Sequence, residues 1–211
     1  MSLDAVYEAV LTGNAPAATE ATNASLSEGL TAEKILYEGC IPAMSEVGRQ
    51  FEIGEKFVPE MLIAARAMSA ATKILRPLLV EEGVEQIGTV VMGTVAGDLH
   101  DIGKNLVGMM MEGAGFGIID LGTDVSPERF VESVTKDKPD IIAMSALLTT
   151  TTRSIINTIN ALEEAGVRDQ VKVMIGGAPI TQDFADKVGA DGFAPDASSA
   201  ARKARTLIGL N

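Results

Sequence analysis

Five segments of strand character alternate with five of helix character after residue 87, and this alternation limits the fold more than any other feature of the sequence. The strand segments are short runs rich in Val, Ile and Met, whereas the segments between them repeat apolar residues at helical spacing. Predicted strands are 88–95, 117–121, 140–145, 171–175 and 191–194, and predicted helices are 103–114, 126–136, 151–166, 180–188 and 196–208. Strands that alternate with helices form a parallel sheet with helices on both faces. Residues 88–211 are therefore predicted to form an α/β domain with a doubly wound, flavodoxin or Rossmann-like sheet.

The sequence before this alternation shows helical spacing only. Thr31 is placed to cap one predicted helix, and Pro42 predicts a kink within it. A longer helix from Pro59 repeats one seam of residues at spacings of three and four: Met61, Ala65, Met68, Thr72, Leu75 and Leu79. Such a seam is typical of bundle packing. Residues 1–83 are predicted to be a four-helix bundle, joined to the α/β domain by a polar linker at 84–87.

The charge and composition of the chain argue against several classes of function. The net charge of −12 and the absence of Trp argue against the basic and stacking surfaces that bind nucleic acid. Cys40 is the one cysteine, which excludes an intrachain disulfide and fits a reducing cytoplasm. The N-terminus lacks the pattern of a signal peptide, and no apolar run approaches the length of a membrane span. We expect a cytoplasmic protein with neither nucleic acid nor a membrane among its partners.

The only histidine of the chain, His100, lies in the stretch Gly97-Asp-Leu-His-Asp-Ile-Gly103. A predicted strand precedes this stretch and a predicted helix follows it, so His100 belongs to a loop at the carboxyl end of the sheet, where open α/β sheets bind ligands. Its imidazole could act as a general base, ligate a metal or face solvent. Asp98 is the candidate partner for its second ring nitrogen. These residues alone leave the three roles open.

Two further loops are predicted to reach the same edge of the sheet. In the strand order 2-1-3-4-5, the loops after the first and third strands flank the switch point, and the loop after the fourth adjoins them. The loop from Ser145 to Thr152 contains four consecutive threonines, of which one hydroxyl is enough to cap the next helix. Gly176 and Gly177 follow the fourth strand, where the lack of Cβ atoms permits either close approach of a ligand or an ordinary turn.

Together these loops carry a specific signature. Asp98-Leu-His-Asp-Ile-Gly103, Ser145-Ala-Leu147 and Gly176-Gly177 closely resemble the D-x-H-x-x-G, S-x-L and G-G motifs of cobalamin-binding domains, and the spacings match as well. The segments 39–48 and 57–68 resemble the helical cap domain that precedes this module in methionine synthase and in the corrinoid proteins of methylotrophic methyltransferase systems. The resemblance extends over nearly the whole chain.

The resemblance implies roles for individual residues. The tail of the corrinoid would leave cobalt and insert beside the sheet, and His100 would replace it as the lower axial ligand of the metal. Asp98 would hydrogen-bond the other imidazole nitrogen, and Thr151 would extend this relay with a hydroxyl, where the family often has serine. Phe57 and Met61 would cap the upper face of cobalt.

The rest of the implied cofactor site lies in the three loops. Gly97, Leu99, Asp101, Ile102 and Gly103 belong to the motif around His100, and Gly103 would let the backbone approach the tail. The slot for the tail would be lined by Ser145, Leu147, Thr149, Gly176, Gly177 and Ala178.

By the same resemblance, the expected cofactor is cobalamin, as methylcobalamin or hydroxocobalamin, or a related corrinoid. The chain is expected to be a non-catalytic carrier that accepts a methyl group from a substrate-specific methyltransferase and delivers it to a second methyltransferase, with tetrahydrofolate or a thiol as acceptor. A reductive activase is a further expected partner. Three alternatives remain: a cobalamin-dependent isomerase subunit, a cobalamin-sensing regulator, and a phosphoacceptor module that uses Asp98 or Asp101.

Overall fold

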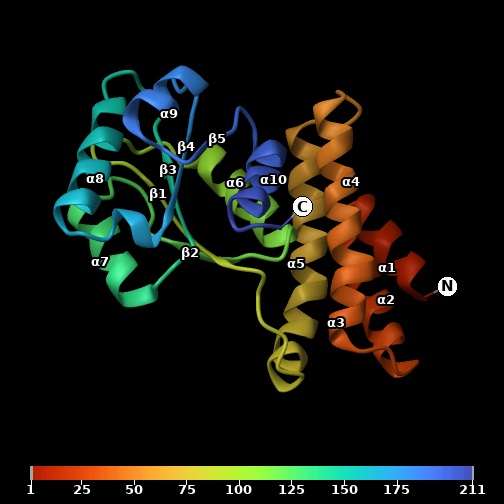
Figure 1. The fold of residues 1–211 in the computed structure, drawn as a ribbon. Coiled ribbons are helices and arrows are strands. Elements are labelled where there is room, and N and C mark those ends of the chain that lie inside the picture. The colour runs from red at the N-terminus through yellow and green to blue at the C-terminus, as the bar shows by residue number, and fades with distance from the viewer. Residues whose placement is uncertain (1, 211) are drawn as a thin grey trace. The chain divides into compact units, whose positions relative to one another are not determined.

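The computed structural model describes residues 2–210, which form two compact units (Figure 1). The first unit contains the residues up to Gln86 together with Gly113–Gly115, and the second contains Ile87–Glu112 and the residues from Phe116 onward. The elements up to Glu81 are α1 (Ser2–Leu11), α2 (Ala15–Ser27), α3 (Ala32–Ile35), the π-helix η1 (Leu36–Cys40), α4 (Ile41–Glu52) and α5 (Val58–Glu81). The later elements are β1 (Thr89–Thr94), α6 (Ile102–Gly113), β2 (Gly117–Asp120), α7 (Pro127–Asp137), β3 (Ile141–Ser145), α8 (Thr152–Glu164), the 3-10 helix η2 (Arg168–Gln170), β4 (Lys172–Gly176), α9 (Gln182–Val188), β5 (Gly192–Phe193) and α10 (Ala197–Leu207).

The first unit is helical, and its helix starts follow from the local sequence. Asn14 and Thr31 cap α2 and α3: Oδ1 of Asn14 accepts the amide of Ala17, and Oγ1 of Thr31 accepts the amide of Lys34. Helices α3, η1 and α4 follow one another without a break, so the predicted bundle of four helical segments is confirmed. The irregularity predicted at Pro42 is a π turn that ends just before this proline, which lies in the first turn of α4.

Helix α5 supplies much of the interior of this unit. Its seam is buried at Met61, Ala65, Met68, Thr72 and Leu75, and half-buried at Leu79. Within this unit, α5 contacts α1, α2 and α4. The methionines of the seam therefore belong to the core, where their flexible side chains fill irregular space.

The second unit contains one parallel sheet with the strand order β2-β1-β3-β4-β5. Successive strands are joined by the helices α6, α7, α8 and α9, and α10 follows the last strand. The predicted doubly wound fold and its strand order are confirmed. Two details differ from the prediction: β5 is only two residues long, and η2 lies between α8 and β4.

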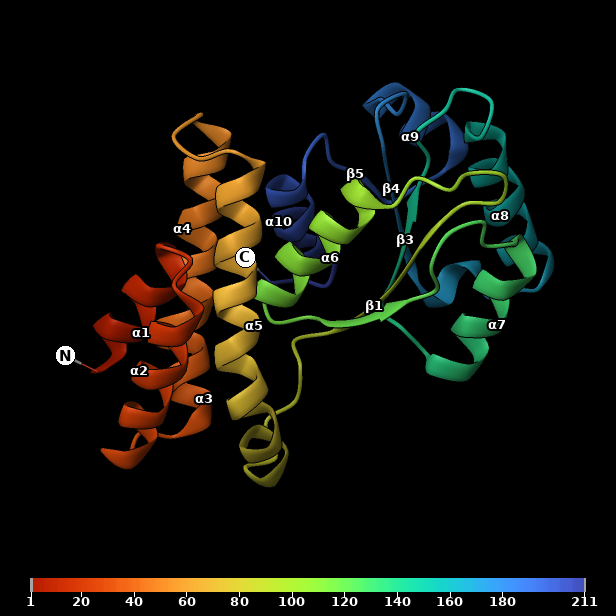
Figure 2. The ribbon, with the colours of Figure 1, turned by 180° about the vertical axis from the view of Figure 1, so that it is seen from behind.

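Helices cover both faces of this sheet (Figures 1 and 2): α6 and α10 lie on one face, and α7, α8 and α9 lie on the other. On the second face, Val91, Ile142 and Val173 of the three central strands pack against Phe130 of α7 and Ile155 of α8. All five side chains are fully buried. Because strands covered on both faces cannot slip without exposing this core, the loops at their carboxyl ends are fixed relative to one another.

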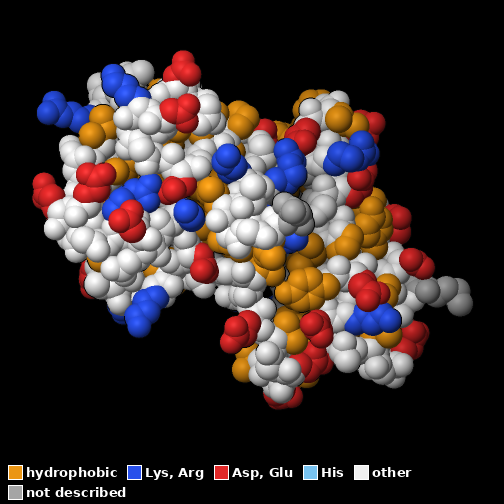
Figure 3. Space-filling model, viewed as in Figure 1, with side chains coloured by type: hydrophobic (Ala, Val, Ile, Leu, Met, Phe, Trp, Pro, Cys, Tyr) orange, Lys and Arg blue, Asp and Glu red, His pale blue; other side chains and the backbone are white. Residues whose placement is uncertain are grey.

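On the face drawn in Figure 3, acidic and basic side chains are interspersed. Within residues 2–210, no helix has both the length and the apolar character that crossing a membrane requires.

Candidate functional site

Three strands of the sheet end side by side, and the candidate site lies in the loops that follow them. Thr94 at the end of β1 pairs with Ser145 at the end of β3, which in turn pairs with Gly176 at the end of β4. Backbone hydrogen bonds continue into the loops, because the amide of Val95 donates to the carbonyl of Ser145 (3.0 Å) and that of Ala146 to the carbonyl of Gly176 (3.1 Å). The three loops singled out in the sequence therefore meet at one edge.

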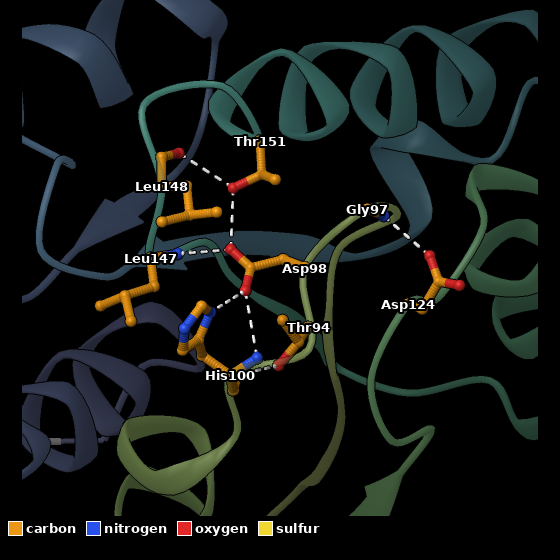
Figure 4. A network of polar contacts seen from close by, with 8 residues as sticks. All are labelled: Thr94, Gly97, Asp98, His100, Asp124, Leu147, Leu148 and Thr151. Atoms are coloured by element: carbon orange, nitrogen blue, oxygen red, sulfur yellow. Dashed lines mark hydrogen bonds and ion pairs between the residues drawn. The ribbon is translucent and has the colours of Figure 1, made fainter.

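The carboxylate of Asp98 is the centre of this arrangement (Figure 4). The residue is fully buried, and each of its carboxylate oxygens accepts two hydrogen bonds. Oδ1 accepts the Nδ1–H of His100 at 2.7 Å and the backbone amide of His100 at 3.1 Å. Oδ2 accepts the backbone amide of Leu147 at 2.7 Å and the hydroxyl of Thr151 at 2.8 Å. Four donors thus fill the acceptor sites that a carboxylate offers.

These donors keep Asp98 ionised although it is buried. Burial by itself raises the pKa of a carboxyl group, because the charged form loses its hydration. The amide of Leu147, the ring of His100, the hydroxyl of Thr151 and the amide of His100 outweigh burial, and they hold the pKa of Asp98 well below its usual range. The result is a fixed negative charge beside the imidazole.

This charge orients the ring of His100. An ionised carboxylate only accepts hydrogen bonds, so Nδ1 carries the proton that it shares with Asp98, and Nε2 of the neutral ring keeps its lone pair. The side chain of His100 is 52% exposed, whereas that of Asp98 is fully buried. The site therefore presents one oriented imidazole, whose Nε2 can donate its lone pair to a metal ion or take up a proton.

Thr151 and Leu147 reach Asp98 from the loop before α8. Thr151 is the N-cap residue of α8, but its side chain makes no capping hydrogen bond. Its buried hydroxyl donates to Asp98 instead, with the carbonyl of Leu148 as a second acceptor at 2.9 Å. The structure thus brings Thr151, Asp98 and His100 into one chain of hydrogen bonds.

The glycines of the site serve two different purposes. Gly177 has a φ of +126°, and a Cβ there would collide with the carbonyl oxygen of Ala146, so glycine is required for the packing of the two loops. By contrast, a Cβ on Gly103 would meet nothing within 4 Å, and one on Gly176 would lie 3.7 Å from the carbonyl oxygen of Ala194. The open space beside Gly103 fits the predicted approach of a ligand, a Cβ on Gly176 would be in ordinary van der Waals contact, and Gly177 is explained by the fold.

Apolar side chains around His100 are exposed. Leu99 and Ile102 are 73% and 79% exposed, and Leu147 is 41% exposed. Large apolar side chains gathered at one place on a surface indicate a site that a ligand or partner covers. Five further predicted residues also line these loops: Gly97, Asp101, Thr149 and Ala178 are exposed, and Ser145 is half-buried.

The two residues predicted from the helical unit differ from one another. Phe57 is the N-cap residue of α5 and is 63% exposed, and its backbone amide donates to the side chain of Glu60 (2.9 Å). Met61 lies one turn further along and is fully buried. Met61 therefore contributes to the core of the helical unit in this structure. The roles of Phe57 and Met61 as a cap stay predictions.

Contacts on the β2 side of the loop were not predicted from the sequence. The hydroxyl of Thr94 donates to the carbonyl of His100 (2.9 Å), and the buried ammonium of Lys104 donates to Asp120 at the end of β2 (2.5 Å). The carboxylate of Asp124 accepts a backbone amide of the loop at 2.7 Å. The predicted strand order could have indicated these contacts. Because β2 neighbours β1, acidic residues at the end of β2 and just after it lie at the same edge of the sheet as the His100 loop.

Known families and proteins match the chain over both units. Two family models, each described as a B12 binding domain, match residues 88–203 and residues 2–76. Trimethylamine corrinoid protein 1 of Methanosarcina acetivorans is 44% identical over 193 residues, which are 90% of this chain and 89% of the relative. Dimethylamine corrinoid protein 3 of the same organism is 41% identical over 206 residues, which are 98% of this chain and 96% of the relative.

Two solved structures share the fold. A cobalamin-binding protein from Desulfitobacterium hafniense DCB-2 superposes with a TM-score of 0.83 and 32% sequence identity over 98% of both chains. A chain of the methanol:cobalamin methyltransferase complex MtaBC from Methanosarcina barkeri gives a TM-score of 0.86 and 27% identity over 98% of this chain and 79% of that chain. The similarity in each case extends over nearly the whole sequence.

Proposed function

This chain belongs to the B12-binding family of corrinoid proteins, and from that membership we propose that it carries a methyl group on cobalt from one methyltransferase to another. The observation that supports this role most strongly is the imidazole of His100, which the buried carboxylate of Asp98 orients with Nε2 left available. A carrier needs such a ligand and no catalytic group of its own.

The residues of the site fit a corrinoid. Cobalt held in a macrocycle needs only one ligand from the protein, and a metal-bound histidine typically donates its second N–H to a carboxylate, as His100 does. Within residues 2–210, no group of three or more His, Cys, Asp or Glu side chains is placed to hold a metal ion without a macrocycle. The exposed Leu99 and Ile102 offer apolar surface beside the ring, and Gly103, where a Cβ would meet nothing within 4 Å, would let a tail approach the backbone.

The chain's own residues would control the lower ligand. When bound, the corrinoid supplies the cobalt that accepts and releases the methyl group. Asp98 holds the Nδ1 proton of His100 and thereby presents Nε2 to the metal. When Nε2 is not coordinated, the hydrogen bond between Nδ1 and Asp98 still holds the ring. Thr151 and the amide of Leu147 hold Asp98 in place, so the ring keeps its orientation through both conditions.

For the methyl donor we propose a methylamine. The relatives named for trimethylamine and dimethylamine are 41% to 45% identical to this chain, whereas the chain from the methanol complex is 27% identical. Higher identity over the whole length favours docking to a methyltransferase of the methylamine class. A second methyltransferase would deliver the group to a thiol or to tetrahydrofolate, and a reductive activase would restore the cofactor.

The alternatives fit the observations less well. Asp98 is fully buried and accepts four hydrogen bonds, so it offers no free oxygen to a phosphoryl donor, and a phosphoacceptor role for Asp101 leaves the oriented imidazole without a purpose. An isomerase subunit is not expected to have the helical unit that the second family model matches. A regulator shares both modules, but the relatives matched over nearly their full length are corrinoid proteins.

The cofactor assignment is tested by loading. The purified chain is incubated with hydroxocobalamin, unbound cofactor is removed, and the absorption spectrum is recorded. We expect stoichiometric retention with a base-off, His-on spectrum for the wild type, and loss of the His-on bands in His100→Ala with circular dichroism unchanged. A folded wild-type chain that retains no cobalamin would contradict the proposal.

The methyl-carrier role is tested with partner enzymes. The loaded and reduced chain is mixed with trimethylamine and a trimethylamine:corrinoid methyltransferase, or with methanol and a methanol:corrinoid methyltransferase. We expect methylation of the cofactor with the first pair and little with the second. Adding a second methyltransferase with either a thiol or tetrahydrofolate then identifies the acceptor. No methylation with any amine or alcohol donor would contradict the carrier role.

A further inference from the structure

Asp124 holds the backbone of the His100 loop from the side of β2. It lies in the loop between β2 and α7, and Figure 4 shows its carboxylate pointing at the Gly97 end of the β1–α6 loop. Its Oδ1 accepts the amide of Gly97 at 2.7 Å, and its own amide donates to the carbonyl of Asp98 at 3.0 Å. One residue therefore fixes two successive residues of the motif.

The backbone of Asp124 is adapted to this contact. Its φ is +53°, in the left-handed region that residues other than glycine seldom occupy, and that Asp and Asn tolerate best. The residues next to it are tied to β1, because the amide of Thr94 donates to the carbonyl of Gly122 and the amide of Val125 donates to the carbonyl of Thr94, both at 2.9 Å. The loop thus extends the sheet, and it holds Asp124 against the motif.

Asp98 is consequently held from two sides, and each side binds a different part of the residue. Leu147 and Thr151, on the β3 side, bind its carboxylate, while Asp124, on the β2 side, binds its backbone. If only the carboxylate of Asp98 were hydrogen-bonded, the backbone of the loop could still move and carry His100 with it. With the backbone fixed as well, the position of the His100 ring is determined.

We propose that Asp124 is a positioning residue for the lower ligand, acting on His100 through the backbone of Asp98. The inference deepens the proposed function, because the orientation of the ring matters for a ligand of cobalt. Its two contributions are separable: the left-handed backbone, and the carboxylate oxygen that accepts the amide of Gly97.

Three variants separate these contributions. Asp124→Ala removes the acceptor and disfavours the left-handed backbone, Asp124→Gly removes the acceptor alone, and Asp124→Asn keeps an acceptor oxygen and tolerates the backbone. Asp140→Ala is the matched control. Oδ2 of Asp140 also accepts a backbone amide at 2.7 Å, that of Thr89, and both aspartates are exposed, but Asp140 precedes β3 at the opposite end of the strands.

The first readout needs no cofactor. Because the chain has one histidine, protein grown with ¹⁵N-labelled histidine gives nitrogen resonances from His100 alone. In the wild type, Asp124→Asn and Asp140→Ala we expect the shifts of a single tautomer with Nδ1 protonated. In Asp124→Ala and Asp124→Gly we expect these shifts to move toward the average of two tautomers.

The second readout is the spectrum of each variant loaded with hydroxocobalamin. Loss of one hydrogen bond of typical net strength corresponds to roughly a fivefold change in an equilibrium. We expect the ratio of His-on to His-off cofactor to fall by about this factor in Asp124→Ala and Asp124→Gly. Asp124→Asn should restore it, and Asp140→Ala should lower the melting temperature without moving the ratio.

The outcomes distinguish this inference from the proposed function. Wild-type His100 shifts and spectra in both Asp124→Ala and Asp124→Gly would overturn the positioning role, as would an equal change in Asp140→Ala. A wild type that binds no cobalamin would overturn the proposed function, and the shifts of His100 in the cofactor-free chain would still decide whether Asp124 positions the ring. If Asp124→Ala does not fold, Asp124→Gly and Asp124→Asn decide the question by themselves.

Discussion

Asp98 in the α/β unit and Cys40 in the helical unit are both fully buried, yet burial has opposite consequences for them. Four hydrogen bonds hold the pKa of Asp98 well below its usual range, against the effect of burial. Burial raises the pKa of Cys40 from its ordinary value of 9.0 to about 12. The first side chain is held charged and the second is held neutral.

This difference distinguishes a site from a core. Two backbone amides, a hydroxyl and an imidazole converge on Asp98 from two loops, an arrangement that packing alone does not require. Cys40 ends the π turn η1 and behaves as a small apolar side chain within the bundle. The comparison teaches that burial alone does not mark function. A functional site is indicated when several hydrogen-bond donors surround a buried charge.

Removing the carboxylate of Asp98 tests this comparison with the largest expected effect. Asp98→Ala leaves buried amides and a hydroxyl without their acceptor, and it should lower the free energy of unfolding of the cofactor-free chain by about 3 kcal/mol. Urea denaturation measures the change. Asp140→Ala is the control: its exposed carboxylate binds one amide that water can reach, so a loss below about 1 kcal/mol is expected. Equal losses in the two variants would break the comparison.

The pH dependence of stability tests the second part of the comparison, the neutral thiol of Cys40. Well below pH 9.0 the thiol of Cys40 is protonated in both the folded and the unfolded chain and contributes no slope. Above pH 9.0 the unfolded chain loses this proton while the folded chain keeps it, so stability falls with rising pH until about pH 12. Between pH 9 and 10, wild type should lose about 1 kcal/mol more than Cys40→Ala, which lacks the titrating group. Parallel pH profiles for the two proteins would show that Cys40 is not shielded.

Substitutions of Thr151 test how much a single hydrogen bond to Asp98 contributes, because the Thr151 hydroxyl is one of its four donors. Thr151→Val keeps the shape of the side chain and removes the O–H, so we expect a loss of roughly 1 kcal/mol in stability and a smaller His-on fraction in the loaded protein. Thr151→Ser keeps the hydroxyl and should stay close to wild type in both measurements. If Thr151→Val stays close to wild type and Thr151→Ser does not, the methyl group rather than the hydroxyl is what position 151 requires.

Phe57 carries the smallest expected change in stability. Its side chain is 63% exposed, so Phe57→Ala should alter the free energy of unfolding by less than about 0.5 kcal/mol. If Phe57 covers the cofactor, the same variant should let the reduced, loaded protein react faster with oxygen. Val80→Ala, at a 79% exposed site near the other end of α5, is the matched control. Identical oxidation rates in the two variants would end the predicted cap role.

The fold was predictable because the periodicity of the sequence matches its burial. Strand β3, for example, is buried at Ile141, Ile142, Ala143 and Met144, as a strand covered on both faces must be, and it reads as an unbroken apolar run. The short β5 was harder, because two residues leave little periodicity to detect. The π turn could be predicted only as an irregularity, since proline marks where a helix is disturbed but not how the preceding turn responds.

The site was predictable where a motif and a loop position agreed. His100, Asp98 and Thr151 could be assembled because the strand order brings their loops together. The role of Asp124 could not be predicted, because a single aspartate in a loop belongs to no periodic pattern or motif. Its role also depends on a left-handed backbone conformation that the local sequence does not indicate. Met61 lies both in a motif-like segment and in the seam of α5, where it is fully buried, and its role as a cap stays a prediction.

The most direct test of the central claim, that His100 is the lower ligand of cobalt, uses the single histidine of the chain. Protein grown with ¹⁵N-labelled histidine is loaded with unlabelled cobalamin and reduced to cobalt(II), and its electron paramagnetic resonance spectrum is compared with that of unlabelled protein. The account predicts that the nitrogen splitting changes from a triplet in unlabelled protein to a doublet in labelled protein, because the coordinating nitrogen is then ¹⁵N from His100. A triplet in both samples would assign the lower ligand to a nitrogen of the cofactor's own tail and would contradict the account.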